Sequence, residues 1–333
     1  MKNKILITGS EGFIGSHLVE SLVKKNCSIK AFVQYNSFNQ IGWLNDLDKK
    51  ILNHVEICFG DIRDFESVNK AVNNCKSVVN LAALIGIPYS YEATESYVDT
   101  NIKGLLNIMN ACKNDQKKII HTSTSEVYGT AQSSKINEKH PLVAQSPYAA
   151  TKTAGDQLAI SFNKSFDLPI GVIRPFNTFG PRQLLRAIIP TIISQTLDPK
   201  LKSINLGNLS TKRSFNYVKD ITDGFYLALK SKRIIGEQIN LGTSYNVSIK
   251  DIVYEVSSIT KIKKKIIIDK NRVRPKKSEV MRLSADSSKA KKLLGWQPKF
   301  DGKDGFKKGL KLTIDWFVKN KIHKNYSSKN YHI

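Results

Sequence analysis

The hydrophobic positions in the first half of the chain form short continuous runs separated by segments with helical spacing. The runs lie at residues 4–8, 29–33, 55–59, 78–81 and 119–120. A short apolar run that ends in glycine or small polar residues is typical of a parallel strand buried on both faces. Between the runs apolar residues recur at helical spacing, most clearly at 101–111. This alternation predicts an α/β fold with a doubly wound parallel sheet.

A glycine-rich turn follows the first run. Gly9, Gly12 and Gly15 lie in the turn, and Phe13 and Ile14 stand where a helical pattern begins. Glycines let the backbone approach a pyrophosphate closely, and the N-terminus of the following helix offers free amide groups to it. Glycines alone would also suit a simple tight turn, but strand, glycine turn and helix in this order are more specific. The segment predicts a Rossmann-type dinucleotide site contacted by these five residues.

Five residues, three of them small or polar, end or follow the third and fourth runs, at the edge where a doubly wound sheet holds its cofactor. They are Asp61, Ile62, Leu81, Ala82 and Ala83. We expect all five to line the cofactor crevice, although Asp61 has the alternative of capping the next helix.

The second run does not end in the acidic residue that commonly holds the adenosine ribose of NAD. Residues 34–36 read Gln-Tyr-Asn, and no arginine stands beside them to favour a 2′-phosphate. The sequence favours NAD as the cofactor and leaves NADP open.

The fifth run brings hydroxyl and carboxylate groups to the same edge. Thr124, Ser125 and Glu126 follow it, and Tyr148 and Lys152 come later, spaced so that both lie on one helix face. A tyrosine hydroxyl ordinarily ionises near pH 10. A neighbouring ammonium and a positive nicotinamide should lower the pKa of Tyr148 towards neutrality. We therefore predict that these five residues are catalytic and that Tyr148 and Lys152 also contact the cofactor.

Composition narrows the class of protein. The 333 residues are 41% hydrophobic and 24% charged, as in an ordinary globular protein. Four cysteines stand singly, which argues against a zinc site or a disulfide framework, and we expect no metal. Neither a signal peptide nor a membrane-spanning run is present, so we expect a cytoplasmic protein without a membrane partner. The net charge of +24 lacks any recognition-helix pattern, and no nucleic-acid partner is expected.

These motifs resemble the extended short-chain dehydrogenase/reductases of the NAD-dependent epimerase/dehydratase group. Further matching pieces are Arg174-Pro-Phe-Asn177, Gly180-Pro181-Arg182, Arg213 to Asp220, Asn240-Leu-Gly242, Arg274-Pro275 and Leu294 to Pro298. The likeness spans roughly residues 4–318. It implies a sugar-nucleotide substrate whose diphosphate or flanks contact Asn177, Arg182, Arg213 and Arg274. It also implies a homodimer formed through helices at 101–112 and 148–163.

The residues after the fifth strand distinguish activities within the group. Residues 124–126, Thr-Ser-Glu, resemble those of dehydratases and of UDP-glucuronate decarboxylases, whereas simple 4-epimerases carry no carboxylate there. The stretch 274–286 resembles that of 4,6-dehydratases, most closely those of legionaminic-acid-type pathways. Decarboxylases have an arginine that grips the substrate carboxylate where this chain has residues 283–286, with Arg282 one place early.

The resemblance implies an NAD-dependent 4,6-dehydratase acting on an N-acetylglucosamine nucleotide, with UDP or GDP as the nucleotide. A UDP-glucuronate decarboxylase and a sugar-nucleotide 4-epimerase are the alternatives. A different class is a nucleic-acid-binding or redox-sensing protein on a Rossmann scaffold, which would not need the Tyr148, Lys152 and Glu126 set.

The second half of the chain is expected to form a smaller substrate domain interleaved with the first. We predict a cofactor domain at 1–177 with a returning segment near 212–243. A sugar-nucleotide domain is predicted at 178–320, and a disordered tail at 321–333.

Overall fold

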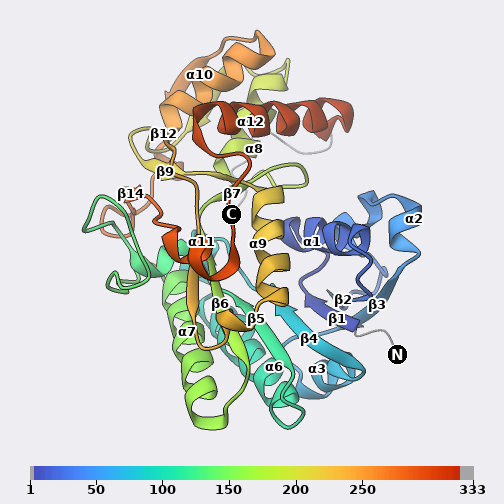
Figure 1. Ribbon diagram of the computed structural model, residues 1–333. Coiled ribbons are helices and arrows are strands. Elements are labelled where there is room, and N and C mark those ends of the chain that lie inside the picture. The colour runs from blue at the N-terminus through green and yellow to red at the C-terminus, as the bar shows by residue number, and fades with distance from the viewer. Residues whose placement is uncertain (1–3, 323–333) are drawn as a thin grey trace.

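The structure, a computed structural model, describes residues 4–322 (Figure 1). A parallel sheet with helices on both faces forms the larger part, and a group of helices and short strands packs above it. The sheet has seven strands in the order β11-β6-β5-β4-β1-β2-β3, all parallel. The α/β fold with a doubly wound sheet is confirmed.

The strands follow the predicted runs closely at one end of the sheet and less closely at the other. They span Lys4–Thr8 (β1), Ile29–Gln34 (β2), Val55–Gly60 (β3), Cys75–Asn80 (β4), Lys118–Thr122 (β5), Ile170–Pro175 (β6) and Gln238–Leu241 (β11). Strand β4 begins at Cys75, three residues before the predicted run at 78. The prediction misses this start because the buried Cys75 is followed by the exposed Lys76, which interrupts the hydrophobic pattern.

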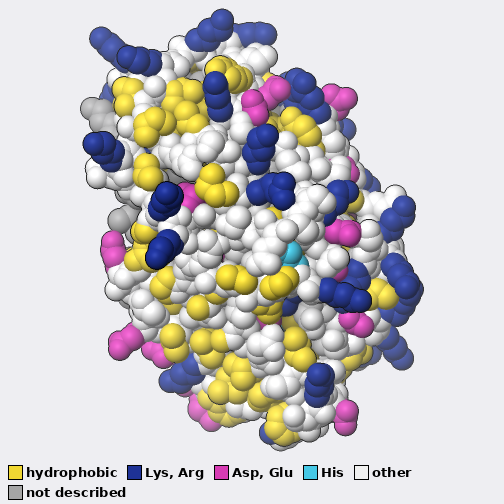
Figure 2. Space-filling model, turned by 90° about the vertical axis from the view of Figure 1, so that its left-hand side faces the viewer, with side chains coloured by type: hydrophobic (Ala, Val, Ile, Leu, Met, Phe, Trp, Pro, Cys, Tyr) yellow, Lys and Arg dark blue, Asp and Glu magenta, His cyan; other side chains and the backbone are white. Residues whose placement is uncertain are grey.

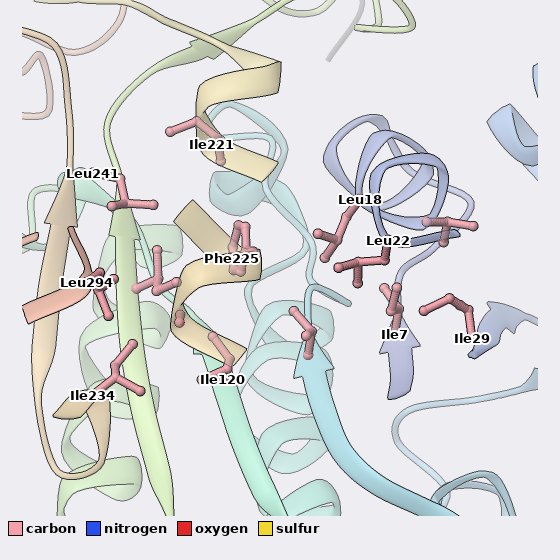
Figure 3. Packing of buried hydrophobic residues seen from close by; sticks show 14 of the residues in the cluster. Ile7, Leu18, Leu22, Ile29, Ile120, Ile221, Phe225, Ile234, Leu241 and Leu294 are labelled. Atoms are coloured by element: carbon pink, nitrogen blue, oxygen red, sulfur yellow. The ribbon is translucent and has the colours of Figure 1, made fainter. Parts of the chain in front are cut away.

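Adjacent residues of each central strand serve opposite faces of the sheet. Ile7 and Ile120 pack towards α1 and α9 (Figure 3). Their neighbours Leu6 and Ile119 pack on the opposite face, towards α3, α6 and α7. The helices span Phe13–Lys24 (α1), Phe65–Val72 (α3), Gly104–Lys113 (α6), Pro147–Phe166 (α7) and Val218–Lys230 (α9). Both faces of the sheet are therefore covered, which explains why the strands read as continuous apolar runs.

The helix predicted at 101–111 begins in an unusual geometry. Its first turns, Val98–Lys103, are π-helical and lead directly into α6. The side chain of Asn101 accepts a hydrogen bond from the Leu84 amide (2.9 Å) and donates to the Leu84 carbonyl (3.0 Å) and the Thr151 hydroxyl (3.0 Å). This buried amide ties the widened turn to α7 and to the loop after β4, next to the candidate site.

A second hydrophobic core lies in the smaller part of the molecule. Its elements are α8 (Ile188–Leu197), β8 (Ser203–Leu206), β12 (Asn246–Ser248), α10 (Ile249–Thr260), β13 (Lys265–Ile268), α12 (Gly302–Lys319) and the shorter strands β7 (Thr178–Phe179) and β10 (Asn216–Tyr217). Strand β9 (Lys212–Ser214) pairs with β12 and with the short strand β14 (Arg282–Leu283). Short α-helices at Lys49–Leu52 (α2), Tyr89–Glu92 (α4), Thr94–Tyr97 (α5) and Ser288–Leu294 (α11) complete the described α-helices.

The chain returns to the sheet after it has built part of the smaller core. Strand β11, which lies in the returning segment predicted near 212–243, pairs in parallel with β6, and α11 then packs against it. Trp296 joins the core beneath the sheet and donates from its indole nitrogen to the Asp220 carbonyl at 2.8 Å. The two parts of the molecule are therefore interleaved along the chain, whereas the domain limits 1–177 and 178–320 stay predictions.

The excess of basic residues is spread over the surface. Figure 2 shows lysines and arginines across the whole visible face, interspersed with acidic, hydrophobic and neutral side chains. Within residues 4–322 no helix is both long and apolar enough to cross a bilayer. The predicted tail at 321–333 lies outside the described residues from 323 onwards.

Candidate active site

A cavity of about 1200 Å³ runs along the carboxyl edge of the sheet and under the smaller part of the molecule. This volume exceeds the roughly 1000 Å³ at the upper end for single ligand pockets, so it has room for two ligands side by side. One end is walled by the glycine turn and the ends of β2 and β3, and the other by segments of the smaller part. All twelve predicted cofactor residues and all five predicted catalytic residues line this one cavity.

The glycine turn is held rigidly against the end of β4. The hydroxyl of Thr8 donates to Asn80 (2.6 Å) and accepts from the amides of Leu81 and Ala82 (3.1 Å each). Gly9, at φ +65°, comes so close to this loop that a Cβ would lie 2.8 Å from the Ala82 nitrogen. The turn and the loop after β4 thus form one wall, as the sequence predicts for a dinucleotide site.

This wall fits a pyrophosphate. Helix α1 begins after Gly12 without a side-chain cap, so its first amide groups are available to a ligand. A Cβ on Gly15 would lie 2.1 Å from the Gly9 carbonyl oxygen, so only glycine allows the turn to close this tightly. Uncapped amides and a positive helix end are what an anionic phosphate binds.

Asp61 does not cap the next helix. Asp64 caps α3 instead, accepting from the Ser67 amide at 3.0 Å. The Asp61 carboxylate accepts a fork of hydrogen bonds from Arg63, at 2.6 Å from Nη2 and 3.0 Å from Nε. Hydrogen bonding to Arg63 lowers the pKa of Asp61, and both side chains line the cavity. The capping alternative was wrong, and the ion pair occupies this carboxylate.

The catalytic candidates meet at the end of β5. Thr124 begins a 3₁₀ turn at Ser125–Tyr128, and its hydroxyl accepts from the Glu126 amide at 3.2 Å. The turn directs the buried Glu126 carboxylate into the cavity, near both Tyr148 and Arg213, whose pKa values respond to its charge. Tyr148 and Lys152 lie on the first turns of α7, which Ser146 caps and Pro147 begins, as the sequence predicts.

The pKa of Tyr148 departs from the prediction. Burial raises the pKa of the phenol above its ordinary value, a hydrogen bond with Thr124 lowers it, and the nearby Glu126 charge raises it. Tyr97 and Ile87 pack around the ring and exclude water. The protein's own groups therefore raise the pKa of Tyr148, against the predicted direction. The prediction also includes a positive nicotinamide beside the ring, which would lower the pKa, so for the cofactor-bound protein it stays a prediction.

Lys152 is fixed by a hydrogen bond to the backbone at the end of β5. Its ammonium donates to the Thr122 carbonyl at 2.5 Å, and burial lowers its pKa to about 8 while the charge of Asp156 opposes that shift. Asp156 is itself fully buried and accepts from Arg174 Nε at 2.8 Å. The lysine is thereby fixed at the cavity wall with a carboxylate one helical turn behind it.

Two of the predicted arginines stand at the far end of the cavity around one carboxylate. Arg213 Nη2 lies 3.5 Å and Arg274 Nη1 4.0 Å from the same Glu279 oxygen. Among the described residues, the buried Arg213 Nη1 and Asn177 Nδ2 have no hydrogen-bond partner. Unsatisfied buried donors are costly, so these two nitrogens are well placed for acceptor oxygens of a ligand.

Arg182 is the one predicted site residue that the structure does not bring to the cavity. Its guanidinium pairs with Glu20 on α1 and lies beside His17, which bonds the Pro181 carbonyl at 2.9 Å. Arg182 takes φ +64°, an uncommon left-handed conformation for an arginine, in the turn that carries it there. The residue joins the two parts of the molecule and is removed from the substrate set.

Several cavity residues were missed by the sequence reasoning. Arg186 lies close enough to Tyr148 to influence its pKa, and Glu279 and Glu11 place carboxylates at opposite ends of the cavity. Tyr97 also influences the pKa of Tyr148, but it packs against the ring without lining the cavity. Glu11 lies inside the glycine turn, and Arg186 follows soon after the Gly180-Pro181-Arg182 motif. The signal available in the sequence was that Glu11 and Arg186 lie beside a motif. That position does not indicate which side chains face the cavity.

The comparison with protein families matches this geometry. A sequence model described as GDP-mannose 4,6 dehydratase matches residues 6–309, nearly the whole chain. The chain belongs to this family. Its members include the NAD-dependent epimerases and dehydratases that the motifs resemble, and the chain's fold and cavity are of that type.

Relatives of this family member differ in activity. The chain is 29% identical to the UDP-N-acetyl-alpha-D-glucosaminuronate decarboxylase of Bacillus cytotoxicus, covering 95% of this chain and 98% of the relative. The crystal structure of a UDP-glucuronic acid 4-epimerase from Bacillus cereus, with UDP-glucuronic acid and NAD, superposes with a TM-score of 0.84. It is 29% identical, covering 95% of this chain and 99% of the other.

A dTDP-glucose 4,6-dehydratase from Bacillus anthracis in complex with NAD gives a TM-score of 0.83 at 26% identity, covering 96% and 98% of the two chains. The family is NAD-dependent. The chain is thus about equally similar to a decarboxylase, an epimerase and a dehydratase. Overall similarity therefore does not distinguish among these three activities.

Proposed function

We propose that this protein is an NAD-dependent nucleotide-sugar 4,6-dehydratase that forms a 4-keto-6-deoxy sugar from an N-acetylglucosamine nucleotide. The observation that carries the proposal is the Glu126 carboxylate, buried at the cavity wall beside Thr124 and Tyr148. A simple 4-epimerase needs no base in this place, whereas removal of water across C5 and C6 requires one.

Each side chain has a distinct task in this reaction. Tyr148 takes the proton of the C4 hydroxyl, and Thr124 holds the same oxygen by a hydrogen bond. Glu126 removes the C5 proton, which the new C4 ketone has made acidic. The C6 hydroxyl leaves as water with a proton from Glu126 or from Ser125. NAD⁺, when bound, would supply the acceptor for the C4 hydride and the donor that returns it to C6, and its positive ring would favour the Tyr148 phenolate. C5 takes up a proton from solvent as the hydride reaches C6, and Tyr148 releases the proton that it took from the C4 hydroxyl, which restores the starting state.

The cofactor and substrate have separate walls. The glycine turn, residues 61–62 and residues 81–83 would hold the dinucleotide, and Lys152 would hold its nicotinamide ribose. Asn177, Arg213 and Arg274 would hold the sugar diphosphate, because their donors converge at the other end of the cavity. Arginine suits this task since its fork donates two parallel hydrogen bonds to phosphate oxygens.

The position of Arg282 supports dehydration over decarboxylation. Its guanidinium donates to the Ser133 carbonyl at 2.7 Å and does not line the cavity. Leu283, the next residue, is fully buried. The arginine that would grip a uronic acid carboxylate in a decarboxylase therefore has no counterpart in that segment, although the relative from Bacillus cytotoxicus keeps decarboxylation as the second candidate.

A mass-resolved assay tests the proposal. The protein is incubated with NAD⁺ and, separately, the UDP and GDP forms of N-acetylglucosamine, dTDP-glucose and UDP-glucuronate. Loss of one water from an N-acetylglucosamine nucleotide is expected. Loss of carbon dioxide from UDP-glucuronate would instead establish the decarboxylase, and an unchanged mass with a new sugar isomer would establish an epimerase.

Deuterated water tests the role of Glu126. The wild-type protein should place solvent deuterium at C5, and Glu126→Gln should reduce both this exchange and turnover by about 10²–10⁴-fold. Glu138→Gln is the matched control, because it changes a partly buried carboxylate that accepts from the Asn240 amide and does not line the cavity. Undiminished exchange at C5 in Glu126→Gln would exclude Glu126 as the base.

A further inference from the structure

The end of the cavity nearest β2 lacks the residue that commonly recognises the adenosine ribose of a dinucleotide. Strand β2 ends in Gln34, which is exposed and carries no charge. In Rossmann sheets an acidic residue at this place commonly accepts hydrogen bonds from the adenosine ribose and repels a 2′-phosphate. The chain therefore lacks the usual carboxylate at the position where it is expected.

A carboxylate from a different element occupies the same place. Glu11, in the turn between β1 and α1, accepts a hydrogen bond on Oε1 from the Gln34 amide at 3.0 Å. Both residues line the cavity. The acidic group therefore lies at the carboxyl end of β2, although it comes from the glycine turn 23 residues earlier.

The second oxygen of Glu11 is buried and free for a ligand. Among residues 4–322, Oε2 has no hydrogen-bond partner. Burial raises the pKa of this carboxyl, while the hydrogen bond from Gln34 lowers it. A buried acceptor left unsatisfied is costly, and a hydroxyl donor would remove that cost.

The glutamate is also held in one orientation. Its carbonyl oxygen accepts from the Trp43 amide at 3.0 Å, and its Cβ packs against Gly42. Gly42 takes φ +54°, and a Cβ there would lie 2.9 Å from the Glu11 Cβ. The turn and the segment after β2 thus enclose the side chain, as expected of a built binding position.

Two other acidic residues line this end of the cavity, and neither offers an equivalent oxygen. Both carboxylate oxygens of Asp61 already accept hydrogen bonds from the Arg63 guanidinium. Asp46 is exposed on the 3₁₀ turn Gly42–Asp46. The Asp61 pair also neutralises Arg63, the cation that would otherwise attract a 2′-phosphate.

We propose that Glu11 binds the adenosine ribose hydroxyls of the dinucleotide and makes the protein select NAD over NADP. The inference deepens the proposed function, since it rests on use of a dinucleotide cofactor. Discrimination would come from the loss of the hydrogen bond between the 2′-hydroxyl and the carboxylate, which NADP replaces with a phosphate, and from repulsion between the glutamate and that 2′-phosphate. A glutamate of the glycine turn here replaces the acidic residue of β2.

Equilibrium binding of NAD⁺ and NADP⁺, measured by calorimetry without sugar nucleotide, tests the proposal. The wild-type protein should bind NAD⁺ at least about 10-fold more tightly than NADP⁺, as one hydrogen bond to a charged group implies. Glu11→Gln, which keeps an acceptor for the Gln34 amide, should lower this ratio by about 10-fold or more. Glu11→Ala combined with Gln34→Asp should restore the preference by returning a carboxylate to β2.

Glu56→Gln is the charge-matched control. It removes a carboxylate of β3 that pairs with Lys4 outside the cavity, and should leave the ratio unchanged. An unchanged ratio in Glu11→Gln, or an equal fall in Glu56→Gln or Asp46→Asn, would overturn the role of Glu11. Failure of the wild-type protein to bind either dinucleotide would overturn the proposed function itself, so the two failures are distinguishable.

Discussion

The two ends of the cavity are built in different ways. The dinucleotide end consists of backbone amides, glycines and small residues that follow parallel strands, and local hydrogen bonds such as those of Thr8 fix it. The nucleotide end consists of arginines on short strands and loops far apart in sequence, gathered around Glu279. The first is a rigid wall for a ligand common to the family. The second consists of long side chains rather than of backbone groups.

The largest effect is expected from a break in the rigid wall. Gly15→Ala places a Cβ 2.1 Å from the Gly9 carbonyl oxygen, so the turn must move. Overpacking of this kind costs about 1–3 kcal/mol, and more where backbone is the obstacle. We expect a thermal unfolding temperature several degrees lower and weaker NAD⁺ binding.

Gly12→Ala is the matched control for this change. Its added Cβ would meet the Gly9 oxygen only at 3.2 Å, a contact that small shifts relieve. Calorimetric unfolding of the two variants should therefore differ clearly. Equal stability of Gly15→Ala and the wild-type protein would show that the turn is adaptable, and that the contrast between the two ends is wrong.

A smaller and more selective effect is expected at the nucleotide end. Arg213→Ala removes one cation and leaves Glu279 with the more distant Arg274. We expect sugar-nucleotide affinity to fall by about 10–100-fold, as for loss of a charged hydrogen bond, with NAD⁺ affinity unchanged.

Arg182→Ala provides the comparison for this second prediction. It removes an arginine of the same half whose partner is Glu20 rather than a ligand. Titration calorimetry with UDP should therefore show weaker binding for Arg213→Ala only. Similar losses in both variants would mean that general positive charge, not placement in the cavity, binds the nucleotide.

The smallest effect is expected at the contact between the two parts of the molecule, where His17 lies. Burial, aided by the charge of Arg182, lowers the pKa of His17 to about 3, so the folded protein keeps this ring neutral. The unfolded chain protonates near pH 6.5. Because the unfolded state binds more protons between these values, stability falls as the pH falls below about 6.5.

Between pH 7 and 5.5 the loss from His17 should be about 1 kcal/mol. His17→Gln, which can still donate to the Pro181 carbonyl, should remove this part of the dependence. Urea unfolding at the two pH values measures it, with His54→Gln, a change at an exposed histidine, as control. An unchanged slope in His17→Gln would place the acid-sensitive group elsewhere.

The sequence predicts the dinucleotide end well because its determinants are local. Strand, glycine turn and helix are contiguous, and Ser146 and Pro147 mark the start of α7 within six residues of both Tyr148 and Lys152. Every residue predicted to line that wall does so. Only β4 was misjudged at its start, where Lys76 interrupts the apolar pattern.

The failures all depend on partners distant in sequence. Arg182 pairs with Glu20 across 162 residues, and no motif foretells that contact. The rise in the pKa of Tyr148 comes from burial beside Tyr97, a neighbour supplied by a different segment. Likewise, the role proposed for Glu11 depends on its hydrogen bond with Gln34 rather than on either residue alone.

The late arrival of β11 has a consequence for synthesis of the chain. Strand β6 ends at residue 175, but its outer neighbour β11 begins at 238, and Trp296 closes the core later still. Until then a nascent chain exposes the unpaired edge of β6, which is a template for aggregation. A fragment ending near residue 177 should therefore be poorly soluble, even though it carries the complete glycine turn and both segments that are proposed to be catalytic.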